Sequence, residues 1–572
     1  MRIGLLVDGD YTTAAAAAVV EHIQACNFAQ IVLIVRHEGA QRDFARHRSW
    51  PQRLLKLVRS RSMRRRFCYA AYTKIESWIA RNEEQDPLRM VDCSQAFAGI
   101  ESLTVKPDEF GFVHRFRPAD VEAIRAYKLD VLLRFGFNIL KGEILTAARC
   151  GIWSYHHGDP EFYRGAPPQF WEMAEGNPLS GAVLQILDEQ LDGGIVLEKG
   201  LFATDLSISL RRNRIQVFWG SAHFVIAKLK TLHERGFEAV LAGAQPSALY
   251  RGRRPIYRTP TNIEVLGWLL RTIWRKVRLR LSPQQVEHWQ IAVRVTPPGG
   301  NRPRLAVDPP NGTADLSGFR FVSSPRGRVY ADPFLIWHQG SAYVFFEQDS
   351  YDGTPAVIAV AKIEGDEVGP AQVCLSTGAH LSYPQVFAHD GEIYMVPESS
   401  EAQEVALYRC LEFPLRWEKS HVLHHGSVVD ATVWHEDGIW YLFATLVVPR
   451  SSAASLHLFT ATHLAGPWSA HPSNPLSYDV RNARGAGPLF RRDGVLYRPS
   501  QDCSGTYGRA IEFNAVDVLT ADDYGEHKVM EITPADVPPF HGAVATGIHT
   551  YHEACGIEVI DAKFLVPARL VR

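Results

Sequence analysis

The C-terminal half of the chain repeats one short pattern four times. Each copy has an apolar run, a turn with Asp-Gly or Gln-Gly, and a second run with aromatic residues, at 332–347, 383–398, 430–445 and 487–501. A turn of this kind between two apolar runs predicts a β-hairpin. The copies start roughly 50 residues apart, which is close to the length of one four-stranded propeller blade.

A less regular fifth copy follows at 547–564. The repeat therefore predicts an all-β domain over residues 286–572, a five-bladed β-propeller. We expect the apolar run at 287–295 to be a strand that closes the ring by pairing with the last blade.

The N-terminal half has a different period. Residues 2–7 and 30–36 are apolar runs, and an alanine-rich stretch after Thr13 lies between them with the composition of a helix. Strand, helix and strand in this order open a parallel α/β sheet. Later runs continue the alternation, with a helix expected at 119–130, a strand at 131–135 and a helix at 140–150. We expect one α/β domain over 1–245.

Residues 246–285 differ from both halves and are predicted to be a linker. An Arg- and Pro-rich segment precedes an amphipathic, basic helical segment, NIEVLGWLLRTIWRKVRLRL. One interpretation of this helix is contact with a membrane surface or a polyanion. The other, which we favour, is that its Leu/Trp face packs between the two domains while its Arg/Lys face lies in solvent. The Arg-rich stretch at 44–66 is interpreted in the same way.

The formal net charge of −1 gives the chain no long-range field that would attract nucleic acid, so a partner must be recognised by a specific site. The eight cysteines are scattered without a C-x-x-C pair, which disfavours a disulfide framework and a thiolate zinc site. Charges near the N-terminus disfavour a signal peptide, and the absence of a long apolar run predicts no transmembrane segment. We therefore expect a cytoplasmic protein.

Residues 151–200 carry the most informative motifs. The sequence S-Y-H at 154–156 is followed by Y-R-G at 163–165 and by L-D-G-G at 191–194. This set resembles the formyltransferase family, in which Asn-x-His, a Tyr/Trp-Arg-Gly turn and a Leu-Asp-x-Gly element occur in this order. The resemblance covers residues 1–240 and implies a formyltransferase-like, Rossmann-like α/β fold for the N-terminal domain.

The resemblance implies transfer of a formyl group from 10-formyltetrahydrofolate to an amine, through a tetrahedral oxyanion. His156 would stabilise the oxyanion, Asp192 would orient the imidazole and relay protons, and Ser154 would assist. Ser154 replaces the asparagine of the family, and loss of such a donor lowers the rate by about 10²–10³. His156, His157 and Asp159 invite a metal interpretation, but neighbouring side chains on an extended loop point apart, so we expect no metal.

The same resemblance implies further contacts. The folate is expected against the loop that follows the buried strand, at Phe135, Gly136, Phe137 and Asn138. Substrate contacts are expected from His157, Arg164 and Gly165. Because the carboxylates of Asp8 and Asp10 would repel a phosphate, the acceptor is expected to be a small amine or an amino sugar rather than a phosphorylated ribonucleotide.

Two alternatives to formyl transfer remain open. The same site could use water in place of the amine, which would make the protein a formyl or amide hydrolase. The chain could also be a non-catalytic glycan-binding protein whose α/β domain is degenerate. Formate release without any amine would identify the first alternative, and glycan binding unaffected by His156→Ala would favour the second.

The predicted propeller resembles the family-43 type glycoside hydrolases. Asp332 and Asp430 stand where that family has its base and its modulating carboxylate. The position of the general acid reads A-G-P at 486–488, so hydrolysis by that mechanism is not expected, although Glu398 could substitute. We expect the propeller to bind a glycan or to act as a scaffold for the enzyme. For glycan binding, four residues are expected to be exposed and to converge near the propeller axis: Asp332, Tyr383, Asp430 and His549.

Overall fold

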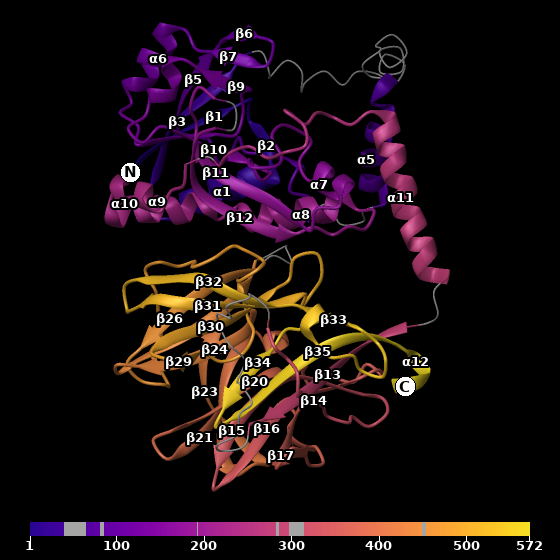
Figure 1. Ribbon diagram of the computed structural model, residues 1–572. Coiled ribbons are helices and arrows are strands. Elements are labelled where there is room, and N and C mark those ends of the chain that lie inside the picture. Colours follow the sequence, from indigo (N-terminus) through magenta and orange to yellow (C-terminus); the bar gives the residue numbers. More distant parts are fainter. Residues whose placement is uncertain are drawn as a thin grey trace. The chain divides into compact units, whose positions relative to one another are not determined.

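The computed structural model describes residues 1–38, 64–79, 85–190, 193–246, 248–281, 285–296, 314–448 and 454–571. Within these ranges the chain forms two compact units (Figure 1). The first covers Met1–Val277, and the second covers Arg278–Val448 and Ala454–Arg572. Across the described ranges, every helix is too short or too polar to span a bilayer.

The first unit is built on a seven-stranded sheet, whose described strands have the order β12-β11-β10-β8-β1-β3-β5. The strands are β1 (Arg2–Val7), β3 (Gln30–His37), β5 (Glu101–Val105), β8 (Val131–Arg134), β10 (Ile152–His156), β11 (Leu179–Ile186) and β12 (Ile195–Ala203). The strands from β10 to β5 are parallel, whereas β11 and β12 pair antiparallel. Because β1 and β8 lie in the middle of the sheet, their apolar side chains are buried.

Helix α1 (Ala14–Ala25) connects β1 to β3 and confirms the predicted strand–helix–strand opening. Its first turn is capped by Thr13, whose side-chain oxygen accepts a hydrogen bond from the N–H of Ala16. Small alanine side chains fill the buried face of α1. The other helices of this unit within the described ranges are α5 (Phe67–Ile79), α6 (Pro118–Arg125), α7 (Phe170–Glu175), α8 (Leu210–Ser221), α9 (Phe224–Arg235), α10 (Phe237–Ala242) and α11 (Asn262–Leu281).

The prediction of a helix at 140–150 is wrong. Strand β9 (Ile139–Lys141) and the 3₁₀ turn η2 (Glu143–Thr146) occupy this segment. Gly142 stands between them with φ of 87°, a conformation that interrupts a helix. Short strands form two small sheets, β2 (Tyr11–Thr13) with β4 (Met90–Asp92), and β6 (Asp108–Phe110) with β7 (Val113–Arg115) and β9.

Helix α11, predicted to be part of a linker, belongs to the core of the first unit. Val265 and Trp268 are buried in one cluster with Phe170 and Tyr257. The ring of Tyr72 on α5 meets the ring of Trp268 edge-on, with centroids 5.2 Å apart. The buried face of this helix thus packs within one unit, and the expectation that its Leu/Trp face packs between the two domains stays a prediction.

The second unit consists of antiparallel sheets. The strands of the first two are β15 (Arg328–His338), β16 (Ser341–Ser350), β17 (Val357–Glu364), β18 (Glu367–Val368) and β19 (Gln372–Leu375), then β20 (Ser382–His389), β21 (Glu392–Glu398), β22 (Glu404–Glu412) and β23 (Arg416–His425). The next two contain β24 (Val428–Glu436), β25 (Ile439–Val447), β26 (Ala454–Ala461) and β27 (Ser469–Ala470), then β28 (Arg484–Gly485), β29 (Phe490–Arg492), β30 (Val495–Asp502), β31 (Ala510–Leu519) and β32 (Tyr524–Ile532).

The last sheet joins the two ends of this unit. It contains β13 (Gln285–Val295), β14 (Arg320–Phe321), β33 (Ala545–Gly547), β34 (Tyr551–Ala554) and β35 (Ile557–Pro567), and the chain ends in α12 (Ala568–Val571). The antiparallel pairing of β13 with β35 runs over the whole length of both strands. The predicted closing strand at 287–295 is thus confirmed.

The hairpin turns have the predicted chemistry. In all four repeats the two central turn residues have positive φ, which defines a type I′ turn. The pairs are Gln339 and Gly340, Asp390 and Gly391, Asp437 and Gly438, and Asp493 and Gly494. Glycine and aspartate tolerate this conformation better than other residues do, so the sequence specifies the turns directly.

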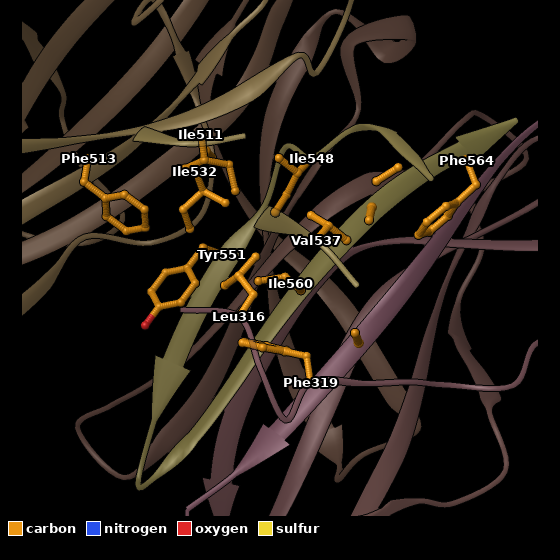
Figure 2. Close-up of a cluster of buried hydrophobic side chains, with 14 of the residues drawn as sticks. Leu316, Phe319, Ile511, Phe513, Ile532, Val537, Ile548, Tyr551, Ile560 and Phe564 are labelled. Carbon is orange, nitrogen blue, oxygen red and sulfur yellow. The ribbon is translucent and has the colours of Figure 1, made fainter. Parts of the chain in front are cut away.

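Buried apolar clusters join each sheet of the second unit to the next. The cluster in Figure 2 joins the sheet of Phe513 and Ile532 to the sheet of Ile560 and Phe564, so the succession of sheets closes on itself. This arrangement is of the predicted propeller type. The predicted count of five blades stays a prediction, because residues 297–313 and 449–453 lie outside the described ranges.

Candidate functional site

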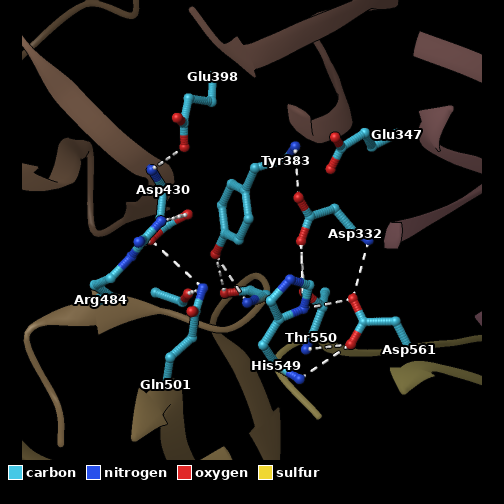
Figure 3. Close-up of polar contacts among 12 residues, drawn as sticks. Asp332, Glu347, Tyr383, Glu398, Asp430, Arg484, Gln501, His549, Thr550 and Asp561 are labelled. Carbon is cyan, nitrogen blue, oxygen red and sulfur yellow. Dashed lines mark hydrogen bonds and ion pairs between the residues drawn. The ribbon is translucent and has the colours of Figure 1, made fainter. Parts of the chain in front are cut away.

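A network of buried polar groups occupies the place where the first strands of the sheets of the second unit meet (Figure 3). Asp332, Tyr383 and Asp430 interrupt β15, β20 and β24 at register shifts, with φ of 51°, 47° and 51°. A positive φ at a residue other than glycine is strained, and such residues gather at functional sites. The three side chains therefore hold equivalent places in three successive sheets.

In the fourth sheet, the position equivalent to Asp332, Tyr383 and Asp430 is Gly487, with φ of 125°. A Cβ on this residue would lie 2.0 Å from the carbonyl oxygen of Tyr551, so a carboxylate cannot stand there without displacing the backbone. The hydroxyl of Tyr383 lies beside Gly487. That hydroxyl accepts the Gly487 N–H at 2.8 Å, donates to the Gly487 carbonyl at 3.0 Å and lies 3.0 Å from the Thr432 hydroxyl.

Asp332 is held by hydrogen bonds from three directions. Its carboxylate accepts the Tyr383 N–H at 3.1 Å and the Thr550 hydroxyl at 2.8 Å, and its own N–H donates to Asp561 at 3.0 Å. Burial raises the pKa of Asp332 well above the usual range of aspartate, and the nearby His549 opposes this shift.

His549 forms an ion pair with Asp561, with 2.6 Å between Nδ1 and the carboxylate. Burial lowers the pKa of His549, but the charges of Asp561 and Asp332 outweigh burial and raise it to about 9. The ring of Trp289 stacks on the imidazole with centroids 4.0 Å apart. His549 is therefore a buried cation at neutral pH.

On the other side of Tyr383, the guanidinium of Arg484 donates two hydrogen bonds to the carboxylate of Asp430, of 2.6 and 3.2 Å. Glu398 accepts the N–H of Asp430 at 3.1 Å. Burial, followed by the charge of Asp430, raises the pKa of Glu398 above its usual range. The amide of Gln501 donates to the Gly485 carbonyl at 2.8 Å.

The prediction that these residues are exposed is wrong. Asp332, Tyr383, Asp430 and His549 have between 0 and 4% of their surface exposed. Their convergence is nevertheless visible in Figure 3. The groups within reach of solvent are less buried neighbours, above all Tyr507, which is 43% exposed and lies under the guanidinium of Arg484 at 4.9 Å.

Several members of this network did not stand out in the sequence. They are Thr550 and Asp561 near the C-terminus, Arg484 and Gln501 in the fourth sheet, Tyr507 between β30 and β31 of that sheet, and Trp289 in the closing strand. Asp561 had one usable signal, because it interrupts the apolar strand β35 and is fully buried.

In the first unit, His156 borders a cavity of about 610 Å³ at the end of β10. Its Nε2 lies 2.8 Å from the carbonyl oxygen of Tyr163. Phe137, Asn138 and Gly165 border the same cavity. Asp192 lies outside the described residues, so its convergence with His156 stays a prediction.

Ser154 is buried and faces Arg134. Its hydroxyl oxygen accepts the Nε–H of Arg134 at 2.9 Å, and it donates to the Tyr155 carbonyl at 3.3 Å. It is not among the residues that border the larger cavity, whereas Arg134 is. The serine thus supports an arginine, which differs from the role of an oxyanion donor that the resemblance implied.

His157 also differs from its predicted role. Its ring stacks on Phe218 with centroids 3.6 Å apart, and burial lowers its pKa to about 3. It borders a separate cavity of about 170 Å³, together with Phe135. Arg164 donates to the Pro160 carbonyl at 2.9 Å and does not border the larger cavity.

The loop at 135–138 has a structural explanation. A Cβ on Gly136 would lie 2.4 Å from the backbone nitrogen of Asp8, so glycine is required there. The Asp8 carboxylate accepts the N–H of Phe137 at 2.7 Å, and Asp10 pairs with Arg36 at 2.8 Å. Both carboxylates of the first loop are therefore engaged by protein groups.

Two groups in the described residues bring possible metal ligands together. Asp332, His549 and Asp561 have ligand atoms within 4.8 Å of one another, and so do a second set, His37, Glu109 and His114. In the first group the histidine is paired as a cation, which competes with metal binding. The expectation of no metal stays a prediction.

The family model described as "Glucosamine inositolphosphorylceramide transferase 1, N-terminal" matches residues 318–536. The protein named glucosamine inositolphosphorylceramide transferase 1 from Oryza sativa subsp. japonica is 37% identical over 202 residues, which is 34% of this chain and 27% of that protein. Methionyl-tRNA formyltransferase from Chlorobium chlorochromatii is 31% identical over 80 residues of the N-terminal part, 14% of this chain and 26% of that protein. The chain thus spans about a quarter of the length of these relatives.

Among solved structures, a thermostable family-43 glycoside hydrolase is similar with a TM-score of 0.29 and 12% identity, over 35% of this chain and 74% of that one. A similarity of this size carries no functional argument.

The predicted function, formyl transfer from 10-formyltetrahydrofolate, is wrong, and so are the hydrolytic and non-catalytic alternatives drawn with it. The longer similarity is to glucosamine inositolphosphorylceramide transferases, and the similarity to formyltransferases is short and partial. Tetrahydrofolate and one-carbon chemistry have no support in the glucosamine inositolphosphorylceramide transferases, which give the longer match. The broader expectation of a transferase agrees with the glucosamine inositolphosphorylceramide transferases, as does the expectation of an amino sugar or a glycan as partner.

Proposed function

We propose that the protein takes part in the transfer of a sugar, and that the polar network at the centre of the second unit binds the sugar-bearing part of the substrate. One observation carries this proposal. The segment that matches the glucosamine inositolphosphorylceramide transferases, 318–536, contributes Asp332, Tyr383, Asp430 and Arg484 to one network from four successive sheets.

The composition of the network suits a sugar. Sugar hydroxyl groups both donate and accept hydrogen bonds, and a carboxylate or a guanidinium can contact two of them at once. Tyr507 is 43% exposed and carries an aromatic ring of the kind on which a sugar ring can stack, and Arg484 lies against that ring.

Glu398 has the properties of a proton-transfer group. Transfer of a sugar from a nucleotide-activated donor forms a bond between the anomeric carbon and the acceptor oxygen and breaks the bond to the nucleotide, which leaves as the diphosphate. The step requires a base that removes the proton of the acceptor hydroxyl. Burial and the charge of Asp430 raise the pKa of Glu398 towards neutrality, where a carboxylate is a stronger base than usual. Asp332 is instead fixed by its hydrogen bonds and positions the neighbouring strand. Activity is therefore expected to rise as the pH rises through the raised pKa of Glu398.

A transfer assay tests this proposal. The full chain is incubated with radiolabelled nucleotide-activated glucosamine and with inositolphosphorylceramide in detergent, and labelled lipid is counted. We expect Glu398→Gln to lower turnover by about 10²–10⁴ because the base is lost. The matched control is Glu392→Gln, at the exposed start of the same strand, β21.

Sugar binding is measured alongside transfer, by saturation-transfer NMR with free glucosamine. The proposal predicts binding by the wild type and by Glu398→Gln, and weaker binding by Arg484→Lys, because lysine cannot make the two-pronged contact. Absence of sugar binding by the wild type, or full turnover by Glu398→Gln, would overturn the proposal.

A further inference from the structure

Helix α11 of the first unit is apolar on two sides. One side is the buried face with Val265 and Trp268. The other faces solvent and is called here the apolar stripe: Ile263, Leu266, Leu270, Ile273, Trp274 and Val277. Ile263 is 83% exposed, Leu270 67% and Trp274 64%, which is far more than an ordinary surface helix shows for such side chains.

The spacing shows that the apolar stripe is one continuous surface. At 3.6 residues per turn, its six members fall within an arc of about 100° of the helix circumference. This arc lies roughly opposite the buried residues. A stripe of this width is what a helix presents to an apolar medium, and scattered exposed residues would not produce it.

Basic residues flank the apolar stripe. Arg271, Arg275, Lys276 and Arg278 are all exposed on α11. The acidic residue of the helix, Glu264, lies in the first turn and pairs with Arg254 at 2.7 Å. An apolar stripe beside positive charge is complementary to a membrane surface that contains anionic lipids.

Helix α5 packs against the buried side of α11 and carries exposed apolar side chains of its own. It runs beside α11 in Figure 1, and the side chain of Asn262 ties the two helices together by accepting the N–H of Cys68 at 2.9 Å. Further along α5, Ile75, Trp78 and Ile79 are exposed, with Trp78 at 85%. Tryptophan is favoured at the interface between lipid and water, because its ring is apolar and its N–H is polar.

We propose that the apolar stripe of α11, with the basic residues beside it, forms a docking surface for an anionic membrane, on which α11 lies parallel to the bilayer plane. The proposal goes beyond the proposed function and does not depend on it. The two fit together, because a protein that acts on a lipid-linked substrate gains by staying at the surface where that lipid resides.

Vesicle flotation tests the docking surface. The full chain is mixed with vesicles of phosphatidylcholine alone, or of phosphatidylcholine with about 30 mol% phosphatidylserine, and centrifuged through a density gradient. We expect the wild type to float with the anionic vesicles and to be released by high salt, which screens the basic residues. The double variant Leu270→Gln and Trp274→Gln should bind at least about tenfold more weakly.

Matched controls separate docking from general effects. The double variant Val495→Gln and Val544→Gln changes two exposed apolar residues of the second unit and should float like the wild type. Circular dichroism checks that each variant is folded. Equal flotation of the wild type and the Leu270 and Trp274 variant would overturn the proposal. The proposal would also be overturned if the wild type did not bind vesicles and was an oligomer while the Leu270 and Trp274 variant was a monomer. A second copy of the chain would then cover the stripe. Because flotation needs no substrate, a failed transfer assay leaves this result unaffected.

Discussion

The two polar centres of the molecule differ in how their groups are held. The centre of the first unit is a cavity of about 610 Å³ with His156 and Arg134 on its border. The centre of the second unit is filled by buried charges that pair with one another, such as Asp430 with Arg484. The motif that stood out in the sequence lies at the first centre, whereas the longer similarity to known transferases lies at the second.

This difference teaches that a motif can identify a scaffold without identifying the reaction. The serine of the S-Y-H motif is turned towards Arg134, and the adjacent His157 is buried against Phe218. Each of these residues has a structural role within the sheet. The strained, charged positions of the second unit are costly to maintain and lie within the segment that matches known transferases, which is why we assign function to them.

The largest expected effect is on the Asp430–Arg484 pair. Arg484→Leu leaves the Asp430 carboxylate buried without its partner, which we expect to destabilise the protein by about 3–5 kcal/mol. Calorimetry of the full chain measures this as a lower transition temperature for the second unit. The matched control is Arg409→Leu in the exposed pair with Glu418, which should cost less than about 1 kcal/mol. Equal effects of the two variants would show that the centre is open to solvent.

The next effect is a dependence of the free energy of unfolding on pH that arises from the titration of His549. Its folded pKa of about 9 lies above the unfolded value of 6.5, so its ion pair stabilises the protein fully below pH 6.5. That contribution, about 3 kcal/mol, is lost as the pH rises through 9. Urea unfolding at pH 6, 8 and 10 should show the wild type losing more stability than His549→Gln. Parallel losses in both proteins would contradict the buried cation.

A smaller effect is expected at Gly487. Alanine there has an unfavourable φ and a Cβ that meets the Tyr551 carbonyl, which should cost about 2–3 kcal/mol. Gly494→Ala is the control, because its φ is also positive but its Cβ meets nothing within 4 Å, so it should cost about 1 kcal/mol. Thermal unfolding compares the two, and a cost at Gly487 no larger than at Gly494 would rule out the close approach.

The smallest effect is expected in the first unit. Ser154→Ala removes one hydrogen bond to Arg134, which also donates to the carbonyls of Phe137 and Asn138. We expect a loss of about 0.5–1.5 kcal/mol in stability and unchanged sugar transfer. A large loss of transfer with intact stability would place the reaction at the first centre instead.

Local patterns of the sequence predicted much of the fold. The Asp-Gly and Gln-Gly pairs, which tolerate positive φ, correctly predicted the hairpin turns. The apolar runs correctly predicted the strands β1, β8 and β13, the last of which closes the second unit. The helix at 140–150 failed because Gly142 interrupts it. The sequence did not reveal that α11 packs into the core of the first unit, because the helical period alone does not show against which segments a helix is buried.

The site was harder to predict for a physical reason. Asp332, Tyr383 and Asp430 reach the centre because a bulge with positive φ turns each side chain, and no residue pattern shows a bulge in advance. Their partners come from distant segments, as the contact of Asp332 with Thr550 shows. Spacing along the chain cannot reveal such pairs, so the sequence located the strand starts but missed the groups that make them a network.

The most direct test of the account is the transfer assay run on two variants side by side, Glu398→Gln and His156→Ala. The account predicts that Glu398→Gln loses transfer of labelled glucosamine to inositolphosphorylceramide, while His156→Ala keeps it, with both variants folded. Loss of transfer in His156→Ala with normal turnover in Glu398→Gln would contradict it and return the reaction to the first unit.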